Sequence, residues 1–261
     1  MPRPTSPYRT TSSFSFGPGP LSTALKAIIG ANVLIFLATT FFPVLRLELG
    51  LVPKWVVPAF LVPAGIDTKL EIWRLVTYSF VHGDLFHILF NMLALWMFGT
   101  ELERMWGTRF FLKFYFIAAV GSGMLTVVVS LIRFPPLQAL LVSNIVGASG
   151  AIFGLLLAYA LYFPTRIIYY FVFPIPVRIY VIISGAIALY ASMSDNGSGV
   201  ANATHLGGLL VAYLYLKGGR LKLNPWAEVK YRYIKWKINR VRKKFDVYSG
   251  GKNDEWNRRV H

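Results

Sequence analysis

One serine and three other polar side chains stand out in an otherwise apolar chain. Ser149 lies in the glycine-rich stretch SNIVGASGAIFGLL, and His205 lies in NATHLGG. His87 and Asn91 are four residues apart, which places them on one face of a helix. A serine beside a histidine can act as a nucleophile with its general base, and ring or amide N–H groups can stabilise the resulting oxyanion. These residue types therefore indicate acyl transfer.

The composition is that of a membrane protein. The chain has 261 residues, of which 55% are hydrophobic and only 15% charged, and its mean hydropathy is +0.53. Several apolar runs approach the ~20 residues that cross a bilayer as a helix. Because there is no cysteine, disulfides and thiolate metal sites are excluded. We expect an all-α, polytopic membrane protein.

Apolar length predicts six membrane spans and a long first loop. The predicted spans are 25–42, 85–103, 110–132, 149–163, 177–193 and 201–217. The segment between the first two spans carries Pro, Trp and scattered charges, which is typical of the membrane interface. The sequence therefore predicts a six-helix bundle with an interfacial first loop.

Three parts of the chain differ in composition. Residues 1–22 are rich in Pro, Ser, Thr and Gly and are predicted to be a disordered cytoplasmic tail. A transit peptide has a similar composition, but this segment lacks the arginine-rich amphipathic pattern. Residues 23–217 form the predicted membrane domain. Residues 218–261 are basic and amphipathic, so we expect them to lie on anionic lipid headgroups. Nucleic acid is not an expected partner, because this tail is tethered to a span.

The positive charges predict the orientation in the membrane. An even number of spans places both termini on one side, and that side collects most of the Lys and Arg in the short loops and the tail. By the positive-inside rule, both termini are cytoplasmic. Because internal targeting signals are lacking, the predicted location is a bacterial plasma membrane.

The four polar residues lie at similar depths. Counted at 1.5 Å per residue, Ser149 lies roughly 22–25 Å and His205 about 18 Å from the inner ends of their spans. His87 and Asn91 lie about 25 and 20 Å from the inner end of theirs. The hydrocarbon core is ~30 Å thick, so all four are inside the membrane, where polar groups are functional candidates.

Small residues allow the two helices that carry Ser149 and His205 to pack closely. They follow or flank the two polar residues at helical spacing: Gly150, Gly154, Ala158, Ala201, Gly208 and Ala212. Close packing would bring the Ser149 hydroxyl within reach of the His205 ring. Taken singly, each feature has a structural explanation, since serines in spans often bond to their own helix and small-residue stripes mostly serve packing. Their common depth favours chemistry.

The surroundings of Ser149 suit a Ser–His dyad. No acid lies within the spans at this depth, so a triad is not expected. Phe153 lies on the same helix face as Ser149 and could stack on the imidazole. The backbone N–H of Ser149 stands at a helix start, and His87 and Asn91 add donors for an oxyanion. Gly147 leaves room for a substrate backbone.

Four motifs give the sequence a specific resemblance to the rhomboid intramembrane serine proteases. GASG (147–150) is similar to the family's GxSG motif, and HILFN (87–91) to its HxxxN motif. NATHLGG (202–208) and EIWRLVTYSFVH (71–82) resemble its sixth-span motif and the end of its first external loop.

The resemblance extends from Thr23 to Lys217 and implies roles for the site residues. It implies Ser149 as nucleophile, His205 as base, and an oxyanion site made by His87, Asn91 and the Ser149 amide. It also implies six spans, a water-filled cavity open to the outside, and mostly single-span membrane proteins as substrates. Many bacterial members carry Tyr at the position of Phe153. Trp73 and Arg74, within EIWRLVTYSFVH, are expected to shape the first loop in the interface.

Two other functions are compatible with parts of the pattern. A catalytically inactive relative would bind membrane proteins for quality control, but such relatives typically lack the serine or the histidine. A transporter would be expected to show inverted repeats or more ionisable groups within its spans. The leading prediction is an intramembrane serine endopeptidase that uses no metal and no organic cofactor, because the His87 and Asn91 pair lacks further ligands.

Overall fold

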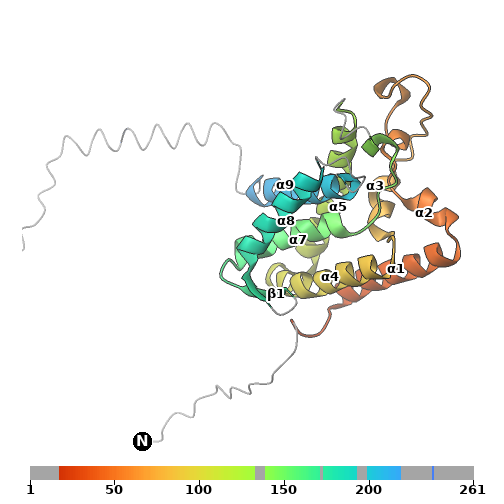
Figure 1. Cartoon of the computed structure of the whole chain (residues 1–261). Helices are drawn as coiled ribbons and strands as arrows, with labels where there is room; N and C mark the ends of the chain where they lie inside the picture. Colours follow the sequence, from red (N-terminus) through yellow and green to blue (C-terminus); the bar gives the residue numbers. More distant parts are fainter. Residues whose placement is uncertain (1–17, 133–138, 171–172, 193–198, 219–236, 238–261) are drawn as a thin grey trace, which may run out of the picture. The chain divides into compact units, whose positions relative to one another are not determined.

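The computed structural model describes residues 18–132, 139–170, 173–192, 199–218 and 237 (Figure 1). Six long helices coincide, to within a turn, with the six predicted spans. They are α1 (Thr23–Phe41), α4 (Leu85–Trp106), α5 (Thr108–Ser130), α7 (Ser149–Tyr162), α8 (Val177–Ser192) and α9 (Gly199–Gly218). Within the described residues, α1, α4 and α5 have the length and apolar composition of full spans, and α7 and α8 are shorter apolar helices. The predicted all-α membrane bundle is confirmed.

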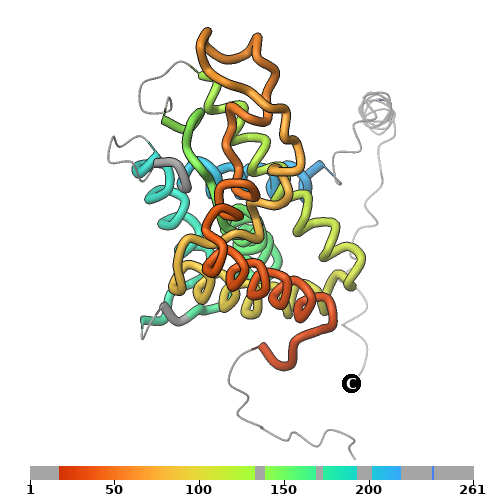
Figure 2. The backbone as a smooth tube through the Cα atoms, turned by 90° about the vertical axis from the view of Figure 1, so that its right-hand side faces the viewer, coloured from red at the N-terminus to blue at the C-terminus, as the bar shows by residue number. Residues whose placement is uncertain are grey.

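The long first loop is built from short helical turns. These are α2 (Val44–Leu49), η1 (Pro53–Trp55), η2 (Ala59–Leu61), α3 (Arg74–Thr77) and η3 (Tyr78–Phe80). In Figure 2 this loop stands at one end of the bundle. It carries exposed apolar side chains, namely Phe60, Leu61, Leu70, Ile72 and Trp73.

Arg74 holds the first loop together from inside. Its side chain is fully buried and donates hydrogen bonds to the carbonyl oxygens of Leu47 and Gly50. It also pairs with the carboxylate of Glu71 and lies over the ring of Trp55, 4.7 Å from its centroid. A buried cation is stable only when it is paired and hydrogen-bonded, so these partners keep Arg74 in place. This arrangement agrees with the structural role expected for Arg74, whereas Trp73 is exposed.

A β-hairpin joins α7 and α8 and was not predicted. Strand β1 (Ile167–Tyr170) pairs antiparallel with β2 (Phe173–Pro176), with Ile167 opposite Pro176 and Tyr170 opposite Phe173. Strand β2, FPIP, was not predicted because it contains two prolines, and proline is rare in sheet interiors and tolerated at edges. In a two-stranded hairpin both strands are edges. A 3-10 turn, η4 (Ala139–Val142), precedes the loop that leads into α7.

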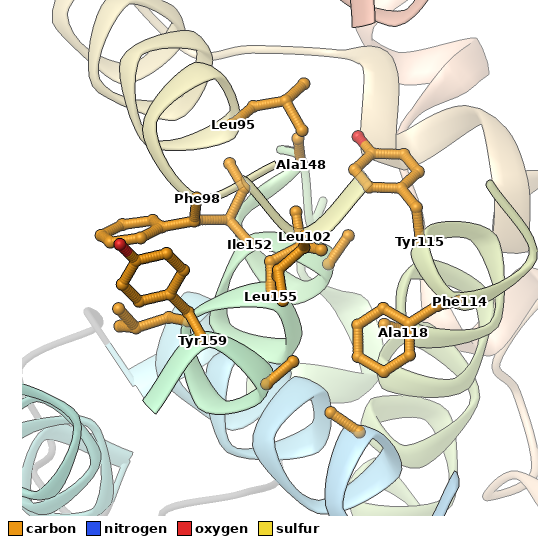
Figure 3. Close-up of a cluster of buried hydrophobic side chains, with 14 of the residues drawn as sticks. Leu95, Phe98, Leu102, Phe114, Tyr115, Ala118, Ala148, Ile152, Leu155 and Tyr159 are labelled. Carbon is orange, nitrogen blue, oxygen red and sulfur yellow. The ribbon is translucent and has the colours of Figure 1, made fainter. Parts of the chain in front are cut away.

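Helix α7 packs against α4, α5 and α8, and Figure 1 shows it in the middle of the bundle. The shared core contains fully buried Leu95 and Leu102 of α4, Phe114 and Tyr115 of α5, and Leu155 of α7 (Figure 3). Helix α1 packs beside α4. The apolar contacts of α4 and α5 thus hold α7, which begins at Ser149, between them.

Part of the segment predicted to be disordered is attached to α4. The indole N–H of Trp96 donates to the carbonyl of Gly19 at 3.0 Å, and Arg104 donates to that of Pro18 at 2.6 Å. The described residues 18–22 are therefore bound rather than free, because side chains of α4 donate hydrogen bonds to the backbone carbonyls of Pro18 and Gly19. The rest of the predicted 1–22 tail, and the predicted basic tail beyond Gly218 apart from Lys237, lie outside the described residues.

Candidate active site

Helix α7 begins at Ser149, inside the predicted depth of the membrane. Its 14 residues span about 21 Å, which is less than the ~30 Å of the hydrocarbon core. The residue before it, Ala148, has no side-chain group to cap the first turn. The first N–H groups of a helix lack intrahelical acceptors, and the helix dipole favours negative charge near them. The start of α7 therefore presents free donors beside the Ser149 hydroxyl.

The structure brings Ser149 and His205 together. The distance from Ser149 Oγ to His205 Nε2 is 2.8 Å, a hydrogen bond between α7 and α9. Phe153, one turn after Ser149, stacks on the imidazole with a centroid distance of 4.3 Å and an interplanar angle of 4°. Nε2 of the imidazole thus faces the Ser149 hydroxyl, and the Phe153 ring covers one face of the imidazole.

Glycines permit the close approach of α7 and α9. A Cβ atom on Gly208 would lie 1.9 Å from the carbonyl oxygen of Gly150, so no other residue fits there without moving a helix. One turn along α7, a Cβ on Gly154 would lie 3.4 Å from Cβ of Ala212. This backbone-to-backbone packing is the kind that the small-residue stripes predict.

The His87 ring is held in a defined tautomer. The backbone N–H of Gly83 donates to His87 Nδ1 at 3.3 Å, so in the neutral ring the proton is on Nε2. That nitrogen faces the loop before Ser149, because a Cβ on Gly147 would lie 2.7 Å from it. Gly147 itself has φ of +119°, a conformation that favours glycine. His87 thus directs an N–H donor at the loop that carries the serine.

Asn91 and His82 complete the polar surroundings of His87. Asn91 is 7% exposed, and its Nδ2 has no hydrogen-bond acceptor among the described residues. His82 is fully buried, and its ring contacts that of His87 edge-on, with centroids 5.0 Å apart. A buried amide donor without a partner is costly, which is typical of a group reserved for a ligand. His82 was not among the predicted site residues.

The first loop holds the backbone that leads into α7. The N–H of Gly147 donates to the carbonyl of Tyr78 at 2.9 Å. Leu51 and Ile145 exchange two backbone hydrogen bonds of 2.8 Å each. Sequence reasoning missed these contacts, because backbone hydrogen bonds between distant segments leave no residue-type pattern. They fix the position of the Ser149 loop against the first loop.

Comparison with known proteins identifies the family. The profile described as "Rhomboid domain" matches residues 69–219, more than half of the chain. The chain belongs to the rhomboid family. All the predicted site residues of this rhomboid lie within the matched region.

Three relatives illustrate the similarity. The chain is 35% identical over 159 residues to Rhomboid protein 1, mitochondrial, of Saccharomyces cerevisiae, covering 58% of this chain and 42% of the relative. It is 36% identical over 140 residues to Rhomboid protease GluP of Bacillus subtilis, covering 54% and 24%. It is 39% identical over 61 residues to Rhomboid protease GlpG of Yersinia pestis, covering 23% and 22%. The similarity thus covers less than half the length of each of these relatives.

The family membership agrees with the architecture. Rhomboid relatives and apolar spanning helices together make this chain a membrane protein of the rhomboid type, related to serine proteases. Its relatives include both bacterial and mitochondrial proteins.

Proposed function

We propose that this rhomboid is an intramembrane serine endopeptidase in which Ser149 is the nucleophile and His205 the general base. The observation that carries the proposal is the 2.8 Å hydrogen bond between Ser149 Oγ and His205 Nε2, with Phe153 stacked on the ring. An activated nucleophile needs a base within hydrogen-bond reach and a third group that orients the base. Here the stacked ring of Phe153 takes part in orienting the base.

The proposed reaction follows the usual logic of acyl transfer. His205 Nε2 takes the proton of the Ser149 hydroxyl while Oγ attacks the carbonyl carbon of the scissile peptide bond. The imidazolium then gives this proton to the leaving amine, and an acyl-enzyme ester remains on Ser149. A water molecule, deprotonated by His205, attacks the ester and releases the second product.

Three donors support a proposed oxyanion site. They are the backbone N–H of Ser149 at the uncapped start of α7, the Nε2–H of His87, and the Nδ2–H of Asn91, which has no acceptor among the described residues. Preorganised donors stabilise the charge that develops on the carbonyl oxygen in the transition state. Gly147 lies between His87 and the nucleophile and leaves room for the substrate backbone.

The proposed substrates are transmembrane segments, mostly of single-span proteins. Ser149 lies at the start of a helix that is too short to cross the hydrocarbon core, so the peptide bond must reach it within the membrane. In a substrate helix that bond is hydrogen-bonded and shielded. The substrate must therefore unwind locally before Ser149 can attack.

Cleavage of a model substrate by the purified, reconstituted protein tests this function. We expect wild type to cut a single-span substrate, and Ser149→Ala and His205→Ala to be inactive. Ser143→Ala is the matched control, because that hydroxyl lies in the same loop but bonds to the carbonyl of Ala139. Cleavage by Ser149→Ala at the wild-type rate would remove the protease assignment in favour of an inactive, membrane-protein-binding rhomboid.

The proposed location is a bacterial plasma membrane with both termini in the cytoplasm. The distribution of Lys and Arg supports this orientation. The basic tail, residues 218–261, is proposed to bind anionic lipid headgroups. Reporter fusions at each terminus in bacteria test the orientation, and periplasmic alkaline phosphatase activity at either terminus would contradict it.

A further inference from the structure

The catalytic base proposed above has one hydrogen bond and one ring contact within the described part of the chain. In the described part of the chain, the His205 ring contacts the Ser149 hydroxyl and the Phe153 ring, and no carboxylate bonds to its second nitrogen. In a serine triad that carboxylate fixes the orientation of the imidazole. Here the position of the His205 ring along and around the axis of α9 depends on how α9 itself is placed in the bundle.

Beside His205, the contact surface of α9 consists of glycines in close backbone contact with α5 and α7. A Cβ on Gly207 would lie 3.1 Å from the Cα of Ser122 on α5, and one on Gly208 would lie 1.9 Å from the carbonyl oxygen of Gly150 on α7. Small residues allow such close approach, but they offer few side chains that interlock. Larger side chains of α9 pack against α5 farther along the helix, where Val211 lies at Gly121 and the Tyr215 ring contacts Phe110 and Phe114. Next to His205, the position of α9 therefore depends on a contact of another kind.

A pair of buried threonines joins α9 to α5 next to His205. The hydroxyl groups of Thr204 and Thr126 are 3.0 Å apart, and the two residues are 2% and 0% exposed. The Thr126 hydroxyl also donates to the carbonyl oxygen of Ser122 at 2.8 Å, which uses its single proton. Thr204 is therefore the donor in the pair, and Thr126 the acceptor.

We propose that the Thr204–Thr126 hydrogen bond is a positioning contact that sets the register of α9 and so places His205 Nε2 at the Ser149 hydroxyl. This inference rests on the proposed function. Thr204 immediately precedes His205, so a shift of one moves the other. The direction of the hydrogen bond between two buried groups restricts both sliding and rotation, which glycine packing alone does not.

Valine substitutions test the contact, because valine keeps the shape of threonine and removes the hydroxyl. We expect Thr126→Val and Thr204→Val each to lower kcat about tenfold with KM within about twofold of wild type, since a small misplacement of a catalytic group slows the chemical step. The double variant should be no slower than either single one, because all three lose the same bond.

Two further variants separate positioning from general stability. Thr126→Ser keeps the hydroxyl and should restore kcat to within about twofold of wild type. Thr100→Val removes another buried hydroxyl, one that donates to the carbonyl of Trp96 in its own helix, and should leave kcat unchanged. All rates are compared well below the unfolding temperature of every variant.

The rate at which a fluorophosphonate labels Ser149 provides the same comparison without a peptide substrate. If the chain cleaves no peptide, the proposed proteolysis fails, while the labelling rates still test the threonine pair. Wild-type rates in both valine variants, additive losses in the double variant, or a Thr126→Ser protein as slow as Thr126→Val would each overturn the proposal.

Discussion

At the scale of single residues, the candidate site depends on atoms whose direction is set by neighbours. The N–H of Gly83 places the proton of His87 on Nε2, and that nitrogen faces Gly147. Phe153 covers one face of the His205 ring. The residues of the candidate site could be selected from the sequence, because polar groups at one membrane depth are rare. The tautomer of His87 was not, since it depends on a backbone donor.

Gly147→Ala should strongly lower activity without unfolding the protein. A methyl group would lie 2.7 Å from His87 Nε2, and alanine disfavours φ of +119°. Because the variant displaces His87, a proposed oxyanion donor, we expect kcat/KM to fall at least ~100-fold. Kinetics on a model substrate and thermal unfolding measure the two effects. Gly30→Ala is the control, since no atom lies within 4 Å of its added Cβ. Wild-type kinetics in Gly147→Ala would show that His87 does not need this space.

At the scale of elements, apolar length was enough to place the six long helices. It did not reveal the turns of the first loop or the β-hairpin between α7 and α8, because short segments owe their structure to distant contacts. Arg74, for example, organises the first loop by hydrogen bonds to Leu47 and Gly50. The approach of α7 to α9 was predictable because glycine stripes have a helical period.

Gly208→Val should separate α7 from α9. Its Cβ would lie 1.9 Å from the carbonyl oxygen of Gly150, and overpacking of this kind costs about 1–3 kcal/mol. We expect a lower unfolding temperature and a loss of Ser149 reactivity, measured by thermal unfolding and fluorophosphonate labelling. Leu210→Val on the same helix, where the side chain is exposed, should change neither. A fully reactive Gly208→Val protein would contradict the close packing of the two helices.

Acid should remove one contact of the first loop. A hydrogen bond from Lys54, and then one from the indole of Trp55, lower the pKa of Asp67 below its usual 3.8. A carboxyl with a lowered folded-state pKa stabilises the fold above its unfolded-state pKa, and this stabilisation is lost as pH falls through the folded-state pKa.

Asp67→Asn should therefore unfold at a slightly lower temperature than wild type at pH 7, with the difference shrinking below pH 3.8. The effect is small because the Asp67 side chain is 63% exposed. Thermal unfolding at several pH values measures it. An equal difference at pH 7 and pH 3 would rule out the charged form as the source.

At the scale of the whole molecule, the helices place the proposed hydrolytic site where the proposed substrate is least reactive. Helix α7 is predicted to start inside the membrane, and its core contacts with α4 and α5 hold it in the bundle. A peptide bond in a membrane helix is already hydrogen-bonded, and exposing its backbone in lipid is costly. In the proposed function, access to Ser149 therefore depends on how easily the substrate unwinds.

Replacing helix-breaking residues near the cleavage point of a substrate by Leu should slow its cleavage. We expect roughly a tenfold fall in kcat/KM, because leucine raises the cost of local unwinding by about 1 kcal/mol or more for each glycine or proline removed. Cleavage of paired substrates in proteoliposomes measures the ratio, with the same replacement far from the cleavage point as control. Equal rates for both substrates would contradict a need for unwinding.

The central claim is that the Ser149 hydroxyl is activated by the His205 imidazole in a place that water and small reagents can reach. Labelling with a fluorophosphonate, followed by mass spectrometry of the peptides, tests it most directly. The account predicts that wild type is modified at Ser149 and that His205→Ala is not. An unmodified Ser149 in folded wild-type protein, or equal labelling in both proteins, would contradict it.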